Sequence, residues 1–377
     1  MAMIYRNNFI VFVLSFFISI LLYSSHVLLP FMFGPIIASI ICVKVFKLDI
    51  KWPFLLSELG IVLLGVQIGS TFTKNVVMDI KNNWLSIIVV SISILLIAIV
   101  MAFVFKKIAR INTETAILSV IPGALTQMLV MAEQDKRANL LVVSLTQMLV
   151  MAEQDKRANL LVVSLTQTSR IIFVVVLVPF ISYFFHDGNM HANGKLTKVL
   201  PLSQVLNIGQ IVILAIAIFI VYLIMSKIKF PTFQLLAPLI VLIVWNFSTG
   251  LTFTLDHWLL NMAQLIYMIR IGVQIAHLLS DLKGRLAIAI TIQNIMLIIG
   301  ALIMVYIIHF FDNNPINELF LGAAPGGVNQ IVLVALATGA DVAMITSYHI
   351  FRIFFILFII APGINYFLKY RSNKRED

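Results

Sequence analysis

Long apolar segments separated by short polar stretches cover almost the whole chain. They lie at about residues 8–25, 28–46, 53–73, 84–107, 114–132, 159–185, 204–227, 231–249, 257–280, 285–310, 317–338 and 342–368. Most are long enough to cross about 30 Å of hydrocarbon as a helix, whereas open strands would leave backbone groups unpaired in lipid. The pattern predicts an all-α polytopic membrane protein.

Three of these segments contain residues that should interrupt a helix, because Pro lacks an amide donor and Gly has a low helix propensity. The interrupting residues are Pro30, Gly34 and Pro35 in the second segment, Pro122 and Gly123 in the fifth, and Pro325, Gly326 and Gly327 in the eleventh. We expect each of the three segments to be broken.

A polar linker at residues 186–203 divides the chain into two membrane repeats, 1–185 and 204–377. Gly-Val-Gln-Ile at 65–68 reappears at 272–275, and IPGALTQ at 121–127 reappears as APGGVNQ at 324–330. The fourteen residues that end at Arg170 align without a gap on those that end at Arg352. The halves are therefore two diverged copies of one unit.

A block of twenty residues occurs twice in succession, at 125–144 and again at 145–164. Pro325 and Arg352 are 27 positions apart, whereas Pro122 and Arg170 are 48 apart, or 28 without one copy. The block is thus an extra copy inserted into the first repeat. Since it carries charged residues at 153 and 155–157, we expect it to lie as an extended or hairpin insertion at the aqueous edge and to impair the protein.

Basic residues alternate between the halves in a way that predicts an inverted topology. Loops after the second and fourth segments of the first half are basic (Lys44, Lys47, Lys51, Lys106, Lys107, Arg110), and their partners in the second half carry no basic residue. The second half is instead basic at Lys227, Lys229, Lys283 and Arg285, and the equivalent places of the first half are an uncharged turn at Ser25 and a loop with Lys74, Asp79 and Lys81. Because basic loops face the cytoplasm, each half should make five full crossings plus one broken or re-entrant Pro-Gly helix, and the basic tail at 369–375 should be cytoplasmic. The net charge of +10 is explained in the same way.

The two Pro-Gly breaks predict a binding site near the middle of the membrane. A helix that is interrupted there exposes free amides and a positive dipole end at the start of its second half. Gln127 and Gln330 follow the breaks by about one turn, and Gln67 and Gln274 either line the same cavity or hydrogen-bond between helices. The alternative is that the glycines serve close helix packing.

Arg170 and Arg352 are candidates for function because charged groups within a membrane are rare. Each follows Asn159 or Asp341 by eleven residues, about three helical turns. Either each Arg pairs with a carboxylate or backbone carbonyls to hold the helices together, or it contacts an anionic substrate. Arg270 and Glu58 form either an ion pair or part of the same polar cavity.

The matched Pro-Gly segments, the Gly-Val-Gln-Ile helices and the Arg-terminated segments resemble the AbrB family of bacterial inner-membrane proteins. The resemblance covers nearly the whole chain and implies a duplicated membrane domain in the plasma membrane, similar to secondary transporters with inverted repeats. Members are labelled as regulators or as ammonia monooxygenases. The acidic residue that often follows the family's Pro-Gly-Gly is replaced here by Gln127 and Gln330, and Ala124 replaces a Gly, which argues against ion coupling at those positions.

Several function classes do not fit the composition. No stretch outside the apolar segments is long enough for a basic nucleic-acid-binding module, so we expect no direct nucleic-acid contact. A copper or iron oxygenase needs clustered ligands, whereas the seven His are scattered, and phosphate-binding loops and nucleophile elbows are absent. We therefore expect no enzyme, no catalytic residue, no metal and no cofactor.

Two hypotheses remain. The first is a secondary transporter or exporter of a small anionic or zwitterionic organic solute. The second is a membrane-embedded sensor that influences gene expression indirectly, without transport. Both have a small solute and membrane lipid as partners, and both leave open whether the chain forms a homo-oligomer.

Overall fold

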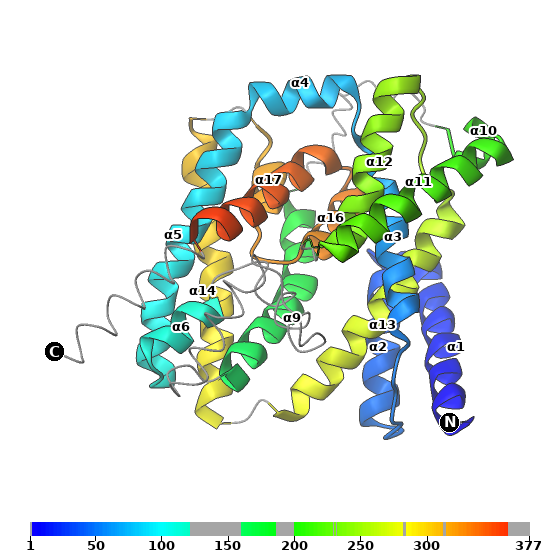
Figure 1. Ribbon diagram of the computed structural model, residues 1–377. Helices are drawn as coiled ribbons and strands as arrows, with labels where there is room; N and C mark the ends of the chain where they lie inside the picture. Colours follow the sequence, from blue (N-terminus) through cyan, green and yellow to red (C-terminus); the bar gives the residue numbers. More distant parts are fainter. Residues whose placement is uncertain are drawn as a thin grey trace.

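The computed structural model describes residues 2–120, 160–185, 200–228, 230, 232–281, 284–311 and 314–360 (Figure 1). Its helices are α1 (Ala2–Ser24), α2 (Pro30–Lys44), α3 (Phe54–Thr71), α4 (Lys74–Asn82), α5 (Trp84–Ala109), α6 (Thr113–Val120), α9 (Leu160–Phe184), α10 (Leu202–Val205), α11 (Ile208–Lys227), α12 (Phe233–Thr249), α13 (His257–Asp281), α14 (Gly284–His309), α15 (Ile316–Ala323), α16 (Val328–Thr338) and α17 (Val342–Phe355), with a π-helical turn at Ile356–Ile360. Every predicted apolar segment contains at least one of them, so the all-α prediction is confirmed.

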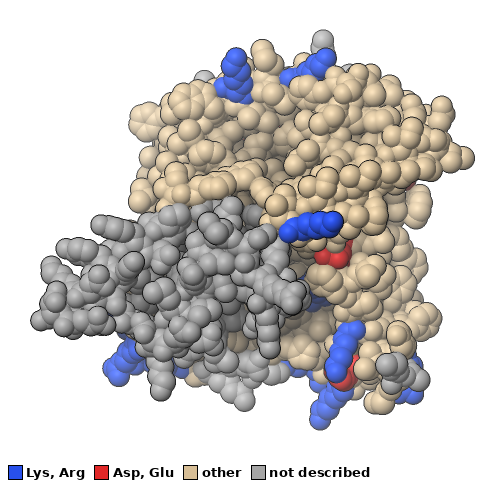
Figure 2. All heavy atoms as spheres, in the orientation of Figure 1, with Lys and Arg blue, Asp and Glu red and all other residues tan. Residues whose placement is uncertain are grey.

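Seven helices in the described part are long and apolar enough to cross a membrane: α1, α3, α5, α9, α11, α13 and α14. Four shorter apolar helices accompany them: α2, α12, α16 and α17. On the face in Figure 2, most of the Lys and Arg side chains lie toward the upper and lower edges of the view, and few charged side chains show in the tan part of the band between them. This distribution is what a polytopic membrane protein requires, because charges are expensive in hydrocarbon.

Only one of the two described Pro-Gly segments is broken. α15 ends at Ala323 and α16 begins at Val328, so Pro325, Gly326 and Gly327 interrupt the segment as predicted. The predicted break in the second segment is wrong: Pro30 starts α2 and Pro35 lies inside it. Pro30 costs the helix no hydrogen bond, because the first backbone amide of a helix has no partner within it. Pro35 removes a single backbone hydrogen bond from a well-packed helix. Pro122 and Gly123 lie outside the described residues.

Equivalent helices of the two halves run in opposite directions. α5 and α14 are the fourth apolar segments of their halves. Arg285 Nε, at the start of α14, donates to Ile108 O at the end of α5 (2.7 Å). Asn314, just beyond the end of α14, donates from Nδ2 to Asn83 Oδ1 at the start of α5 (3.1 Å). The two helices are therefore antiparallel, as the inverted charge pattern predicts. The end of α5 and the start of α14, which both lie beside basic loops, meet at the same end of the pair.

The helices form two packed groups that each combine matching parts of both halves. One group contains α1–α3 and α11–α13, on the right of Figure 1, and the other contains α5, α6, α9 and α14–α17. The Gly-Val-Gln-Ile helices pack across the halves within the first group. A Cβ built on Gly65 would lie 2.7 Å from Leu235 O of α12, and one on Gly272 would lie 2.8 Å from Ile36 Cα of α2. These glycines serve close helix packing.

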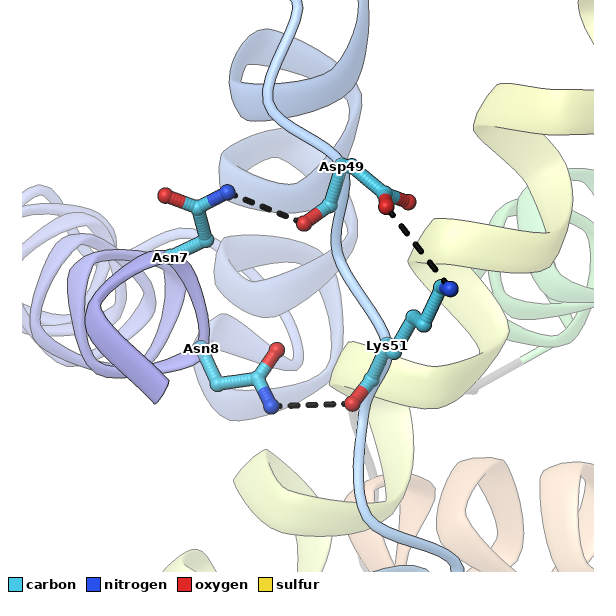
Figure 3. Close-up of polar contacts among 4 residues, drawn as sticks. All are labelled: Asn7, Asn8, Asp49 and Lys51. Carbon is cyan, nitrogen blue, oxygen red and sulfur yellow. Dashed lines mark hydrogen bonds and ion pairs between the residues drawn. The ribbon is translucent and has the colours of Figure 1, made fainter. Parts of the chain in front are cut away.

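The start of α1 is tied to the segment that follows α2 (Figure 3). Asn7 Nδ2 donates to Asp49 O at 3.0 Å, and Asn8 Nδ2 donates to Lys51 O at 2.8 Å. The adjacent Lys51–Asp49 ion pair is 3.9 Å long and both side chains are 67% exposed, so it adds little stability. The two amide bonds make α1 and α2 antiparallel and bring the N-terminus to the basic loop at 44–51.

Candidate functional site: the broken helix α15–α16

The break between α15 and α16 is held open by its Pro and Gly residues. Pro325 and Ala324 are buried, Gly326 is half-buried and Gly327, the residue before α16, is exposed. A Cβ built on Gly326 would lie 2.7 Å from Val174 Cγ1 of α9, so only glycine allows α9 to approach this closely. The break therefore lies against α9 and opens at Gly327.

Two side chains of α17 occupy the carbonyl end of α15. Arg352 is 2% exposed and donates to Ala324 O (3.1 Å), Gly326 O (3.4 Å) and Ala323 O (3.5 Å). His349 accepts from Arg352 at Nδ1 (2.6 Å) and lies 3.0 Å from Leu321 O at Nε2. These contacts require a neutral imidazole with its hydrogen on Nε2. Arg352 and His349 thus satisfy the carbonyls that the interruption leaves without partners.

Arg170 repeats this arrangement in the first half. It lies on α9, is 6% exposed and donates to Ser119 O (2.6 Å) and Val120 O (3.0 Å) at the end of α6. α6 and α9 thus correspond to α15 and α17. Arg170 and Val174 are four residues apart on α9, so Arg170 lies one turn from the contact with Gly326.

These contacts bear on the two alternatives for Arg170 and Arg352, a structural role in holding helices together or contact with an anionic substrate. Both bind backbone carbonyls, as the first alternative requires. Among the described residues no carboxylate lies within 4 Å of Arg352. Within that described part, its positive charge faces the partial negative charge at the end of α15, roughly half an elementary charge.

The opposite end of the break, the start of α16, has no side-chain cap. Gln330 Nε2 and Asn329 Nδ2 donate to the hydroxyl of Tyr267, at 2.9 and 3.4 Å, and all three residues are buried. Tyr267 lies on α13, in the other group of helices. The amide end of α16 therefore faces the boundary between the two groups.

Three other predicted site residues lie elsewhere. Gln67 is buried and accepts from the backbone amide of Leu255 (2.8 Å), so it fixes the loop before α13. Gln274 is exposed, unlike its counterpart. Asp341 caps α17 by accepting from Met344 N (2.9 Å), and eleven helical residues, about 16 Å, separate it from Arg352. Gln127 lies outside the described residues, like Pro122 and Gly123.

Glu58 and Arg270 do not form an ion pair with each other in the described part of the chain. Glu58 accepts from Tyr222 Oη (2.9 Å) and Gln234 Nε2 (3.1 Å) of α11 and α12. Arg270 lies 5.0 Å from the centre of the Phe54 ring, a cation–π contact. Neither residue belongs to the break.

Sequence reasoning missed His349 and Tyr267. His349 precedes Arg352 by three residues on one helix, a spacing that places both on one face and could have been noticed. No sequence signal identifies Tyr267, whose partners are more than sixty residues away. In the described part, no group of three His, Cys, Asp or Glu residues is placed to hold a metal ion.

Comparison with known proteins places the chain. A family model described as "Transition state regulatory protein AbrB" matches residues 31–149 and 144–368, two stretches that overlap only inside the repeated block. A protein of Escherichia coli (strain K12) named "Putative regulator AbrB" is 23% identical over 367 residues, which cover 96% of this chain and 97% of that protein. A protein of Bacillus subtilis (strain 168) named "Uncharacterized protein YhjN" is 21% identical over 314 residues, which cover 81% and 76%. Because the family model matches well over half of its residues, the chain belongs to the AbrB family.

Proposed function

We propose that this AbrB-family membrane protein is a secondary transporter or exporter of a small organic anion and not an enzyme. The observation that supports it best is the asymmetry of the break. The carbonyl end of α15 is covered by Arg352 and His349, whereas the amide end of α16 has no side-chain cap and faces the boundary between the helix groups.

Electrostatics favours an anion at this place. Helix ends carry partial charges of roughly half an elementary charge, negative at the end of α15 and positive at the start of α16. These two nearly cancel, so the full charge of Arg352, which has no carboxylate within 4 Å among the described residues, favours an anion there. Positive charge deep in an apolar protein is costly unless something compensates it. A bound anion does so, and the free amides of α16 can receive it.

The division into two groups supports transport by relative movement. Inverted-repeat transporters move one bundle against another around a site at their boundary. Here the boundary between the two groups combines apolar contacts of α13 with α9 and of α3 with α17 with hydrogen bonds from the start of α16 to one hydroxyl, that of Tyr267. Hydrogen bonds of this kind can be broken and formed again during a transport cycle at a modest energetic cost.

Flux measurements test the proposal. The full chain, reconstituted in liposomes, should move at least one anion from a panel of labelled organic acids, and Arg352→Gln should lower the rate at least tenfold. Arg285→Gln is the matched control, because Arg285 also binds a backbone carbonyl but lies exposed at the start of α14. Zero flux across the panel, both for the full chain and for the form without residues 145–164, would contradict transport.

A membrane-embedded sensor is the second candidate, because the Escherichia coli relative is named as a regulator. Such a protein would bind a solute at the same break and act on gene expression through a partner, without direct contact with nucleic acid. Solute binding without flux would favour it.

We also propose that the basic loops and the C-terminal tail face the cytoplasm of a bacterial cell. After replacement of the native cysteine by Ser, a cysteine introduced at Lys47 should react with impermeant reagents only in inverted vesicles, and one at Lys74 only in intact cells. The opposite pattern would refute this orientation.

A further inference from the structure

The start of α16 carries a hydrogen-bonding group that the protein leaves unused. Gln330 is 5% exposed, and its Oε1 atom has no hydrogen-bond partner among the described residues. The other atom of the same amide, Nε2, is fixed on Tyr267 Oη at 2.9 Å. A buried, oriented amide oxygen without a partner is unfavourable unless a ligand or water completes it.

This oxygen is aimed at the break. A Cβ built on Gly327 would collide with Gln330 Oε1, so the side chain folds back over the residue that precedes α16. Gly327 itself is exposed, whereas Val328 and Asn329 are only 6% and 8% exposed. The first-turn amides of α16 and the buried Gln330 carbonyl therefore lie together beside Gly327, the exposed residue of the break.

The surrounding charge restricts what can bind there. Arg352 lies on the far side of the same break, 3.4 Å from Gly326 O, with no carboxylate within 4 Å among the described residues. An ammonium group on the ligand would be repelled by this guanidinium, so a zwitterion is disfavoured. A plain carboxylate fits the charge but leaves the Gln330 amide unsatisfied.

We infer that the site takes small carboxylates that carry a hydroxyl group beside the carboxylate. The carboxylate occupies the first-turn amides of α16, and the hydroxyl bonds the Gln330 side chain. A hydroxyl group can donate a hydrogen bond to the Gln330 carbonyl, and unlike an ammonium group it adds no positive charge. The inference names the substrate class of the transport site proposed above and rests on that proposal only for the location of the site.

Binding to the purified full chain tests it without any need for flux. Three sets of probes with matched carbon skeletons are titrated by calorimetry: acetate, glycolate and glycine; propionate, lactate and alanine; succinate, malate and aspartate. In the set that binds most tightly, the hydroxy acid should bind at least tenfold more tightly than the other two, about the effect of one well-made hydrogen bond. A tighter or equal amino acid, an equal deoxy acid, or no binding by any probe overturns the inference.

Two variants locate the effect. Gln330→Met removes the amide at similar size, and Gly327→Ala places a methyl group against Oε1 and displaces it. Both should reduce the preference for the hydroxy acid over the deoxy acid from about tenfold to about one, whereas Gln204→Met, in an exposed short helix, should leave it unchanged. An unchanged preference in a folded Gln330→Met protein overturns the inference. If this variant does not fold, the titration of the three sets of probes against the wild-type protein still decides the inference.

The inference and the transport proposal can fail separately. Tight binding of the hydroxy acid with no flux in liposomes refutes transport and leaves the substrate class standing. Flux of a plain carboxylate or an amino acid, with no preference for the hydroxy acid, supports transport and refutes the substrate class.

Discussion

Replacing Arg352 with Ala should destabilise the protein even when no solute is present. The guanidinium donates to three backbone carbonyls at the end of α15, and two of them belong to Ala323 and Ala324, which are fully buried. The bond to Ala324 O is short at 3.1 Å, whereas the other two are 3.4 and 3.5 Å and therefore weaker.

The size of the effect follows from these contacts. A buried carbonyl that loses its partner costs about 1–3 kcal/mol, so the three together cost about 4 kcal/mol at the middle of that range when the two long bonds are counted as half. Removal of the guanidinium also removes its desolvation penalty, which returns about 2 kcal/mol. The net loss of about 2 kcal/mol corresponds to a fall in the unfolding midpoint of about 2–3 °C for a chain of this size.

The assay is thermal unfolding of the detergent-purified protein at one fixed heating rate, without added solute. Arg285→Ala is the control: its exposed side chain makes one carbonyl bond, and we expect a shift below about 1 °C. Arg352→Lys should lie between wild type and Arg352→Ala, because an ammonium group lacks the planar fork. A midpoint for Arg352→Ala within 1 °C of wild type would show that the arginine does not hold the break in the free protein.

Three further predictions concern packing and the repeated block. Gly272→Ala should lower the unfolding midpoint by several degrees, because the new methyl group meets the backbone of α2, whereas Gly209→Ala, with nothing within 4 Å of its Cβ position, should not. Asn246→Leu should cost about 1–3 kcal/mol, because Asn246 Nδ2 lies 3.1–3.2 Å from three carbonyls that end α3, and denaturation in detergent would show it. Deletion of residues 145–164 should raise solute binding or flux by restoring the spacing of the second repeat; equal activity of the two forms would remove that hypothesis.

The fold could be predicted from the sequence more completely than the site. The apolar segments, the inversion of the halves and the break after Ala323 all follow from local composition, and the structure has them. The prediction of a break in the second segment was wrong, because Pro30 takes the first position of α2 and Pro35 lies inside this helix. A proline indicates a lost hydrogen bond, but the packing around it decides whether the helix ends.

The candidate site, too, could be predicted only in part from the sequence. Sequence reasoning found Arg352 and the Pro-Gly-Gly residues, because a charge and a helix breaker in an apolar segment are unusual wherever they occur. It did not find that Asp341 caps its own helix, nor that Gln67 binds a loop amide. Short polar side chains have several local and distant partners to choose from, and the sequence does not rank them.

Sequence by itself determined which segments are apolar helices long enough to cross a membrane and that α5 and α14 of the two halves run in opposite directions, since these features depend on the apolar length of a segment and the charges beside it. Only the tertiary structure decided which polar groups meet. Glu58 and Tyr222 are 164 positions apart, and Tyr267 and Gln330 are 63 apart, so their hydrogen bonds depend on how distant helices pack. Hydrogen bonds act over about 3 Å, and only close packing brings such distant side chains within that range.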